Sequence, residues 1–327
     1  MIYPALWQIW QRMVTKMKAK LIMTVQEGEN RAAWLDMRNQ GIGGSDAGTI
    51  VGDNPWKSPY ALWLEKTGQL VPEDISGTDP VYWGTTLEDV VAREFTKRTG
   101  KRVRRCGMMQ STQTPWLFAN VDRLVIGEKA GLECKTTNAF NVKAWQDDGL
   151  PNAYYWQCQH YMMVTGLPTW YIAVLIGGQH YDYKCIPRND DDIDYLAQKE
   201  EEFWNMVQTM TPPPIDGSRS TTEAIQGQYP GGQTAPVELP QEAADALALI
   251  DNAKAERKRL DDVIMTQENV IKCLMGDDEI ATIGDRKVTW KNQKGRITVD
   301  TKKLKKEFPD VYEACMKQGK PTRRFLV

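Results

Sequence analysis

Glu133 and Lys135 lie two positions apart in the stretch GLECKT, residues 131–136. Along a β-strand the side chains alternate between two faces, so these two point to one side while Cys134 points to the other. Asp122 closes the preceding strand-like stretch, WLFANVD, and a short connection with two glycines joins the two stretches. A hairpin over this connection would bring the three charged side chains together.

An aspartate, a glutamate and a lysine in one place suit attack of water on a phosphodiester. Carboxylate oxygens bind Mg²⁺, which prefers octahedral oxygen ligands and keeps several waters. The ion neutralises developing charge and lowers the pKa of its water, and Lys135 is placed to orient that water or to take its proton. The D-x10-E-x-K spacing alone is a weak signal, because a surface carboxylate pair with a salt-bridging lysine has the same letters.

Composition argues against several other kinds of site. The six cysteines include no C-x-x-C pair, which argues against a disulfide scaffold and a zinc or iron–sulfur site and suits a reducing cytoplasm. Two histidines in 327 residues give a histidine-rich metal site little to work with. Any metal is therefore expected to be a hard cation held by carboxylates. The formal charge of −2 gives no overall sign of nucleic-acid binding, so such a signal has to be local.

The first 22 residues mix aromatic side chains with lysines. Their apolar part is too short and too interrupted to span a bilayer, and the charges follow it, which is the reverse of a signal peptide. One interpretation is a peripheral amphipathic helix. We favour the other, an upstream extension before a functional start at Met23, and expect a cytoplasmic protein with no membrane segment.

Residues 30–210 show the helix and strand signals of one compact α/β unit. Two apolar stretches at helical spacing each end in glycine, which is typical of helix C-termini. Strand-like stretches surround the Asp, Glu and Lys positions. In chain order we expect helices over 58–68 and 85–100, strands over 102–110, 116–122 and 131–136, a helix over 153–166, strands over 169–178 and 180–186, and a helix over 192–208.

Beyond this unit the composition changes. Residues 211–240, rich in Pro, Gly, Thr and Gln, predict a linker. Residues 241–276 predict a long helix whose broken apolar stripe is packed or self-associating. Strands over 279–293 and 296–300 and a helix over 301–316 are expected after it. Residues 281–327 hold 13 Lys or Arg and 5 Asp or Glu, which is either solvated surface or a surface that binds phosphates. The predicted domains are an N-terminal extension (1–29), a main domain (30–210), a linker (211–240) and a helical plus small basic α+β C-terminal region (241–327).

Six blocks of the main domain, in order, resemble the PD-(D/E)xK nucleases, and among them the lambda-exonuclease-like, or YqaJ-type, phage recombination nucleases. The blocks are WLDMRNQGIGGSDAGTIVG, NPWKSPYALWLEKTG, WGTTLEDVVAREF, ANVDRL, LECKT and WQCQHYMMVTG. The resemblance implies an α/β fold with a restriction-endonuclease-like core, in which helices flank a mixed central sheet. Its α+β C-terminal appendage lies outside the matched part.

The resemblance also implies a metal site. Asp122, Glu133 and the main-chain carbonyl of Cys134 would bind Mg²⁺, with Mn²⁺ able to substitute and two ions expected. Lys135 would position and activate the water, and Glu88 would add a carboxylate near the second metal.

Two of these helix residues have plainer interpretations. Glu88 has the alternative of an exposed helix glutamate paired with Arg93 or Lys97. Gln157 would hold the site from the following helix, with Tyr161 one turn on, and has the alternative of a polar neighbour of the core.

Arg38 and Ser45 would face the phosphate at a DNA 5′ end, as a bidentate guanidinium and a hydroxyl can. Alone, Arg38 is equally a surface helix arginine, and GIGGSD a turn or a helix N-cap. Two positions depart from the family pattern. Val121 stands where the family has its nominal proline, and Asn120 where the lambda enzyme has a phosphate-binding serine. Asn120 can still donate a hydrogen bond.

The function implied is a metal-dependent deoxyribonuclease, a 5′→3′ double-strand exonuclease that generates single-stranded tails for phage-type homologous recombination. A ring-shaped trimer around double-stranded DNA, a single-strand annealing protein as partner and a host cytoplasm belong to the same implication. The basic stretch KRTGKRVRR is a candidate surface for tracking a duplex, or a charged strand edge that prevents aggregation.

Two alternatives use the same fold. One is a structure-specific or restriction-like endonuclease on the same metal site. The other is a catalytically silent DNA-binding subunit, against which the joint presence of the five residues named above argues (Glu88, Asp122, Glu133, Lys135 and Gln157).

Overall fold

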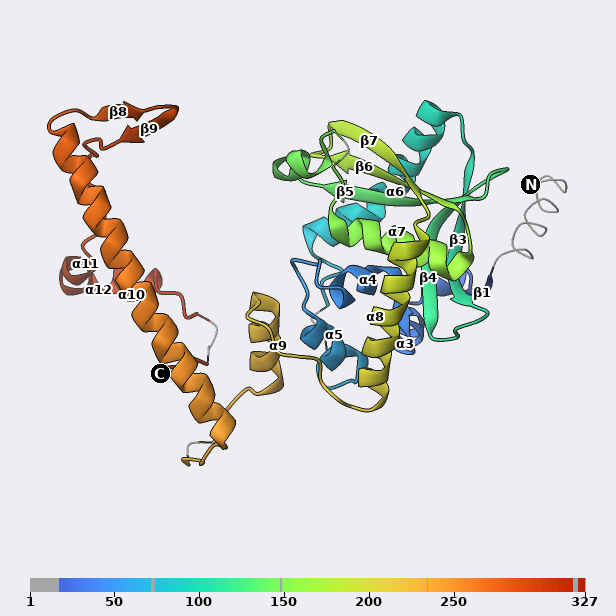
Figure 1. Ribbon diagram of the computed structural model, residues 1–327, viewed down its shortest axis with the longest axis horizontal. Helices are drawn as coiled ribbons and strands as arrows, with labels where there is room; N and C mark the ends of the chain where they lie inside the picture. Colours follow the sequence, from blue (N-terminus) through green and yellow to red (C-terminus); the bar gives the residue numbers. More distant parts are fainter. Residues whose placement is uncertain (1–17, 72–73, 148, 234, 320–322, 327) are drawn as a thin grey trace. The chain divides into compact units, whose positions relative to one another are not determined.

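The computed structural model describes residues 18–71, 74–147, 149–233, 235–319 and 323–326 (Figure 1). The chain divides into two compact units, one ending at Pro230 and one beginning at Gly231. Most of the expected N-terminal extension, residues 1–17, lies outside the described residues. No helix of the described residues is long and apolar enough to cross a membrane.

The first unit is built on one mixed sheet of seven strands. Its β5–β6 and β2–β4 pairs are parallel and its other pairs are antiparallel. The long strands lie in the order β1 (Ala19–Met23), β3 (Val103–Ser111), β4 (Leu117–Val125), β5 (Ala130–Thr137), β6 (Thr169–Ile176) and β7 (His180–Pro187), and the short β2 (Ile42–Gly43) pairs with β4.

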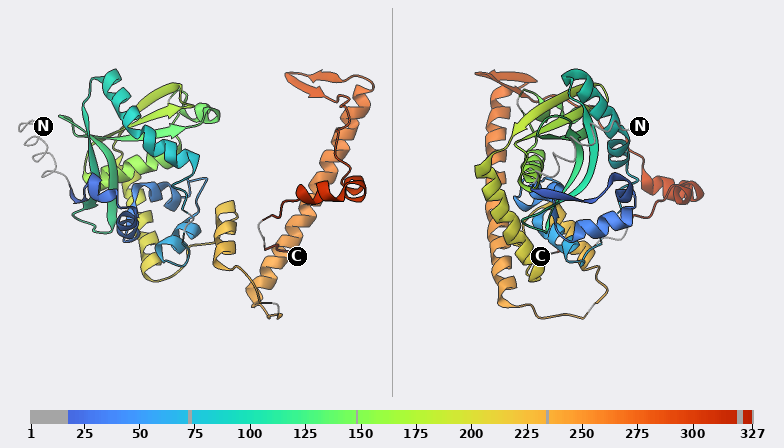
Figure 2. Two further views of the ribbon diagram at one scale, coloured as in Figure 1. Left: turned by 180° about the vertical axis from the view of Figure 1, so that it is seen from behind. Right: turned by 90° about the vertical axis from the view of Figure 1, so that its right-hand side faces the viewer.

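Helices flank this sheet, as expected of a restriction-endonuclease-like core (Figures 1 and 2). The larger apolar core joins one face of the sheet to α4 (Gly44–Ile50), α5 (Pro59–Lys66), α7 (Asn152–Thr165) and α8 (Asp190–Gln208). The smaller core is formed with α6 (Asp79–Thr99), whose Val91, Ala92 and Phe95 pack on strand residues that include Leu132 and Tyr171. These buried helix positions recur three to four apart, which is the spacing that gives a helix one apolar face.

The predicted start of the domain at residue 30 is wrong. Strand β1 pairs with β3 through a register that sets Ala19 opposite Ser111, and it ends the sheet on that side. The short helix α2 (Val25–Gly28) follows, capped by the Thr24 side chain. Five residues are too few to show a clear alternation of apolar and polar side chains. The strand is recognised only by its hydrogen bonds to β3, which lies far along the chain.

The predicted linker 211–240 is wrong in its middle part. Helix α9 (Arg219–Gln228) lies within it and packs against α5. Thr221 Oγ1 donates a hydrogen bond to Ser58 Oγ at 2.8 Å, and Tyr60 Oη donates one to Gln228 Oε1 at 3.0 Å. Thr221 and Ala224 are buried. Proline and glycine on either side bound this helix, so composition alone concealed it.

The second unit contains helix and strand, as predicted. Its elements are α10 (Gln241–Met275), the hairpin β8 (Ile280–Ile283) and β9 (Arg286–Thr289), α11 (Thr301–Glu307) and α12 (Pro309–Ala314). The strand expected at 296–300 is absent from the described residues, because both strands fall within 280–289 around a turn in which Gly284 has a φ of 55°. Met275 is the buried residue of α10. Ile250 and Ile271 of its apolar stripe are half-buried, and the remaining large side chains of the stripe are exposed, namely Leu249, Leu260, Val263, Ile264 and Leu274.

Two helices of the first unit complete the surroundings of the site. Helix α3 (Arg31–Asn39) is capped by Asn30, and its last turn carries Arg38. The 3-10 helix η1 (Ala139–Trp145) follows β5.

Candidate active site

The hairpin of β4 and β5 brings the predicted Asp, Glu and Lys together. Its register pairs Arg123 with Leu132, which places Asp122 beside the GLECKT strand. Asp122 Oδ2 accepts a hydrogen bond from the Cys134 amide at 2.9 Å, and Lys135 Nζ lies 2.6 Å from Glu133 Oε1. The common face predicted for Glu133 and Lys135 is confirmed, with Cys134 packed on the opposite side against the core of α6.

Helix α7 holds the Glu133 carboxylate in place through the side chain of Gln157. Gln157 Nε2 donates hydrogen bonds to Glu133 Oε1 and to Tyr161 Oη, each at 2.8 Å. Glu133 is 4% exposed, and its second oxygen, Oε2, is buried without a hydrogen-bond partner among the described residues. A buried carboxylate oxygen left in this state costs free energy, unless a cation or water completes it.

The carboxylates of Asp122, Glu133 and Glu88 repel one another. Burial raises the pKa of Asp122 well above its ordinary value, and the Glu133 and Glu88 carboxylates raise it further. Burial alone would lower the pKa of Lys135, but Glu133, Tyr154 and Asp122 outweigh burial and raise it. A cluster with this excess of negative charge is stabilised by a cation.

The donor set fits a hard divalent cation. Asp122 and the unpartnered Oε2 of Glu133 supply the carboxylate oxygens that Mg²⁺ prefers. No three acidic, cysteine or histidine side chains in the described parts of the chain converge on a metal position by themselves. The main-chain carbonyl of Cys134 would therefore be needed as a further protein ligand.

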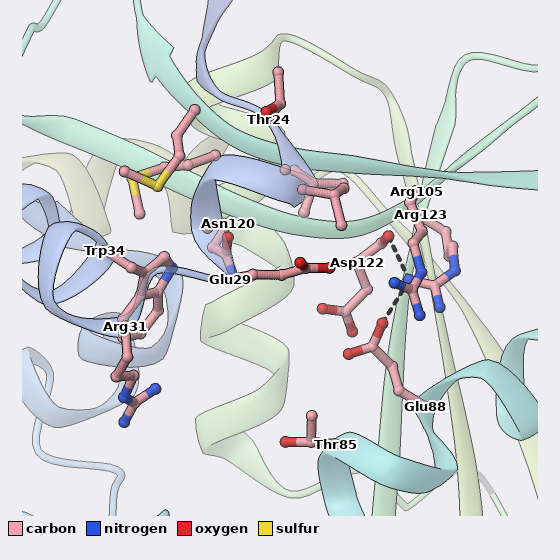
Figure 3. Close-up of a pocket in the computed structure, with 16 residues that line it drawn as sticks. Thr24, Glu29, Arg31, Trp34, Thr85, Glu88, Arg105, Asn120, Asp122 and Arg123 are labelled. Atoms are coloured by element: carbon pink, nitrogen blue, oxygen red, sulfur yellow. Dashed lines mark hydrogen bonds and ion pairs between the residues drawn. The ribbon is translucent and has the colours of Figure 1, made fainter.

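Glu88 faces the same site but is held by an arginine. Its Oε1 lies 2.5 Å from Arg123 Nη1, which also donates to the Asp122 carbonyl at 2.7 Å (Figure 3). Arg123 Nη2 bonds Asp89 Oδ1 at 2.6 Å. The alternative pairing of Glu88 with Arg93 or Lys97 is wrong, because α6 turns Glu88 toward the sheet.

Sequence reasoning missed Arg123. It is 4% exposed, so its guanidinium has to be paired inside the protein. One signal in the sequence could have found it. Arg123 directly follows Asp122 in a largely apolar strand, so alternation turns it to the opposite, covered face of the sheet, where a guanidinium needs a carboxylate partner.

The predicted substrate-binding residues line one cavity together with three of the predicted catalytic residues. This cavity, of about 120 Å³, is lined by residues that include Arg38, Ser45, Asn120, Asp122, Glu133, Gln157 and Tyr161. A second cavity of about 340 Å³ shares Trp34, Met108, Asn120 and Asp122 with it and reaches Glu88, Thr85, Arg31 and Arg105 (Figure 3). Asp122 thus lies where the two cavities meet.

The GIGGSD turn forms one wall of the smaller cavity. Arg38 Nη2 donates to Ser45 Oγ at 3.1 Å and to Asp46 Oδ1 at 2.8 Å. A Cβ on Gly44 would come within 2.4 Å of the Tyr161 ring, so the close approach of this turn to α7 requires glycine. The alternative of a helix N-cap is also correct, because α4 begins at Gly44 with Gly43 as its N-cap residue.

The basic stretch at residues 97–105 is largely paired. Arg98 lies 2.8 Å from Glu94, Lys101 bonds Glu128 at 2.5 Å, and Arg105 bonds Asp89 at 2.6 Å. These ion pairs argue against an open surface for tracking a duplex. The alternative of a strand edge does not hold for the whole stretch, because residues 97–99 end α6 and β3 lies between β1 and β4.

The sheet and the site together define a PD-(D/E)xK protein, in which a hairpin of a mixed sheet presents an aspartate beside a Glu-x-Lys strand. Residues 33–168 match the YqaJ-like viral recombinase domain. The "uncharacterized protein YqaJ" of Bacillus subtilis (strain 168) is 41% identical over 307 residues, which span 88% of this chain and 92% of that protein. This chain belongs to the YqaJ-like viral recombinase domain family.

Two solved structures are also similar. An alkaline exonuclease from Laribacter hongkongensis superposes with a TM-score of 0.48 at 17% identity, over 55% of this chain and 94% of that one. A phage related exonuclease from Haemophilus somnus 129PT gives a TM-score of 0.39 at 13% identity, over 52% of this chain and 96% of that one.

Proposed function

We propose that this protein is a metal-dependent deoxyribonuclease, a 5′→3′ double-strand exonuclease that leaves single-stranded tails for homologous recombination. The observation that carries the proposal is the state of Glu133. One of its oxygens is fixed by Lys135 and Gln157, while the other is buried, without a hydrogen-bond partner among the described residues. The geometry suits a carboxylate that completes a metal site next to a lysine.

Mg²⁺, or Mn²⁺ in its place, would be held by Asp122, Glu133 and the Cys134 carbonyl. When bound, the ion supplies charge neutralisation at the scissile phosphate and acidifies a water. Glu88 would serve a second ion after leaving Arg123.

The side chains then divide the remaining work. Lys135, whose pKa is raised and which therefore keeps its own proton, orients the attacking water, which loses its proton to solvent. Gln157 keeps Glu133 in one orientation. The water oxygen forms a bond to phosphorus, one phosphorus–oxygen ester bond breaks, and the leaving oxygen takes up a proton.

The smaller cavity would receive the 5′ end of the DNA. Arg38 supplies a guanidinium, Ser45 a hydroxyl and Asn120 an amide, which are donors that phosphate oxygens accept. All three line the cavity that Asp122 and Glu133 also line, so a terminal phosphate and the first phosphodiester fit one site. This arrangement supports double-stranded DNA with a 5′ phosphate as substrate.

Family membership supports the cellular setting that we propose. A single-strand annealing protein is the partner that the resemblance to phage recombination nucleases implies. A ring-shaped trimer around the duplex and a location in the host cytoplasm complete the proposal.

The experiment is digestion of a linear duplex by wild type, Glu133→Gln and Glu202→Gln. Glu133→Gln keeps the shape of the side chain but loses its charge, so release of nucleotides in Mg²⁺ should disappear. Glu202 lies on the surface of α8 in a pair with Lys199, and its variant should match wild type. EDTA should stop both active proteins. Undiminished digestion by Glu133→Gln, or by wild type in EDTA, would refute the proposed metal site.

A further inference from the structure

A buried lysine contacts the segment between Arg38, at the end of α3, and Ser45, at the start of α4. The side chain of Lys66, in the last turn of α5, is 2% exposed. Its ammonium donates to the Arg38 carbonyl at 2.9 Å and to the Gly41 carbonyl at 2.7 Å, and it lies 2.9 Å from Asp46 Oδ2. All three partners are acceptors. Three acceptors require the protonated amine, because a neutral amine has only two N–H groups to donate.

Asp46 therefore faces two cations. Its Oδ1 accepts from Arg38 at 2.8 Å, and its Oδ2 accepts from the Gly43 amide at 3.1 Å in addition to Lys66. Burial would raise the pKa of Asp46, but Lys66 and Arg38 outweigh burial and hold it well below the ordinary range. The cluster of Arg38, Asp46 and Lys66 then contains two positive charges and one negative charge, a net charge of +1.

This net charge determines how strongly Arg38, which lines the smaller cavity, attracts an anion. An arginine paired with one carboxylate is close to neutral at a distance and attracts a phosphate weakly. Among the described residues, Nη2 is the guanidinium nitrogen of Arg38 that makes hydrogen bonds, to Ser45 and Asp46. Nε and Nη1 remain for a ligand, and the uncompensated charge makes that ligand anionic.

We propose that Lys66 is a positioning residue that makes the cavity selective for a terminal phosphate dianion. It acts through Arg38, because its positive charge keeps the Arg38–Asp46 pair from being electrically neutral. Its hydrogen bonds to the carbonyls of Arg38 and Gly41 hold the ammonium in place. The inference rests on the proposed function, since the phosphate is taken to be that of a DNA 5′ end.

A purely structural lysine makes a different prediction from an electrostatic one. Lys66→Met leaves a neutral Arg38–Asp46 pair, whereas Lys66→Met combined with Asp46→Asn restores the net charge of +1. If Lys66 only supports the turn, the double variant should be no better than the single variant. If its charge matters, the double variant should recover selectivity although the lysine is absent.

The experiment measures binding of a short duplex with a 5′ phosphate and of the same duplex with a 5′ hydroxyl. Fluorescence anisotropy in Ca²⁺ gives the ratio of the two dissociation constants, independently of hydrolysis. Wild type should prefer the phosphate. Lys66→Met should reduce that preference by about tenfold or more, since a unit charge at this range contributes on that order. The double variant should regain most of it.

Either an unchanged ratio in Lys66→Met or no recovery in the double variant would overturn the inference. Thermal melting first establishes that each variant folds. Where Lys66→Met does not fold, Asp46→Asn alone decides: its net charge of +2 should strengthen the phosphate preference, and a weaker preference would overturn the inference.

Wild type that prefers the phosphate but does not hydrolyse DNA would refute the nuclease and leave this inference standing. Wild type that hydrolyses DNA without any preference would refute the inference alone.

Discussion

Gln157 Nε2 lies 2.8 Å from Glu133 Oε1, although the two residues are 24 positions apart in the chain. This bond ties α7 to β5 and leaves Oε2 of the same carboxylate free to meet a cation. The amide also bonds Tyr161, which lines the cavity of Arg38 and Ser45. One side chain thus connects the proposed metal site with the proposed phosphate site.

Gln157→Leu should lower metal affinity. Loss of a partner that orients a ligand typically costs about 10- to 100-fold in affinity. Calorimetric titration with Mn²⁺ measures this directly and does not depend on turnover. Gln159→Leu is the matched control, because Gln159 lies on the same helix and bonds Pro187 and Asn189 instead. Equal losses in both variants would show that Gln157 acts only through general stability.

Lys135→Met should abolish hydrolysis while DNA binding persists. Removal of the ammonium that orients the water should cost roughly 10²- to 10⁴-fold in rate. Lys184→Met on β7 should keep wild-type activity, since its ammonium bonds the Asp147 carbonyl, outside the two cavities. Nuclease assays and anisotropy on the same preparations separate rate from binding. A Lys135→Met variant that still digests DNA at the wild-type rate would remove lysine from the mechanism.

Much of the site could be predicted because its residues are close in sequence or lie on regular elements. Alternation in β5 placed Glu133 and Lys135 on one face, and the short connection placed Asp122 beside them. The contacts that could not be predicted join distant elements. Arg123 reaches Glu88 across 35 positions, and nothing in helical or strand periodicity specifies such a pair.

The edges of the domain were the least predictable part of the fold. Strand β1 and helix α9 are short, and each is stabilised by partners far along the chain rather than by its own pattern. Lys66 shows the same limit for a side chain. Its position in α5 suggests a solvent-exposed helix end, where lysine favours the helix dipole, but the loop before α4 covers it.

The free energy of unfolding should fall as the pH rises above neutrality, because His160 and Glu200 form a buried pair between α7 and α8. His160 Nδ1 lies 2.7 Å from Glu200 Oε1, and His160 Nε2 lies 2.8 Å from the Phe118 carbonyl. Burial lowers the pKa of His160, but Glu200 outweighs it and the net shift is upward. Burial raises the pKa of Glu200 by more than His160 lowers it.

The pKa values of His160 and Glu200 are both raised, so this pair binds protons more tightly in the folded protein than in the unfolded chain. The resulting stability is present below the ordinary histidine pKa of about 6.5 and is lost as the pH rises through the raised value. Melting temperatures measured across this range should decline in wild type and change less in His160→Gln. Parallel curves for the two proteins would contradict this assignment.

The basic segment 281–327 of the second unit should contribute to DNA affinity. Replacing the four lysines of α11 with glutamine should weaken duplex binding and make its salt dependence shallower, because fewer counterions are released. These lysines are Lys302, Lys303, Lys305 and Lys306. Anisotropy titrations over a range of salt concentrations give the slope. An unchanged slope would assign the unit to protein contacts instead, with the apolar side chains of α10 as the surface to test next.

The central claim is tested most directly by supplying DNA with and without ends. Linear duplex labelled at either the 5′ or the 3′ terminus, and a covalently closed circle, are incubated in Mg²⁺ with wild type and with Glu133→Gln. Wild type should release nucleotides from 5′ ends and leave the circle intact, and Glu133→Gln should release none. A nicked or linearised circle would show an endonuclease. No cleavage of any substrate in Mg²⁺ or Mn²⁺ would contradict the account altogether.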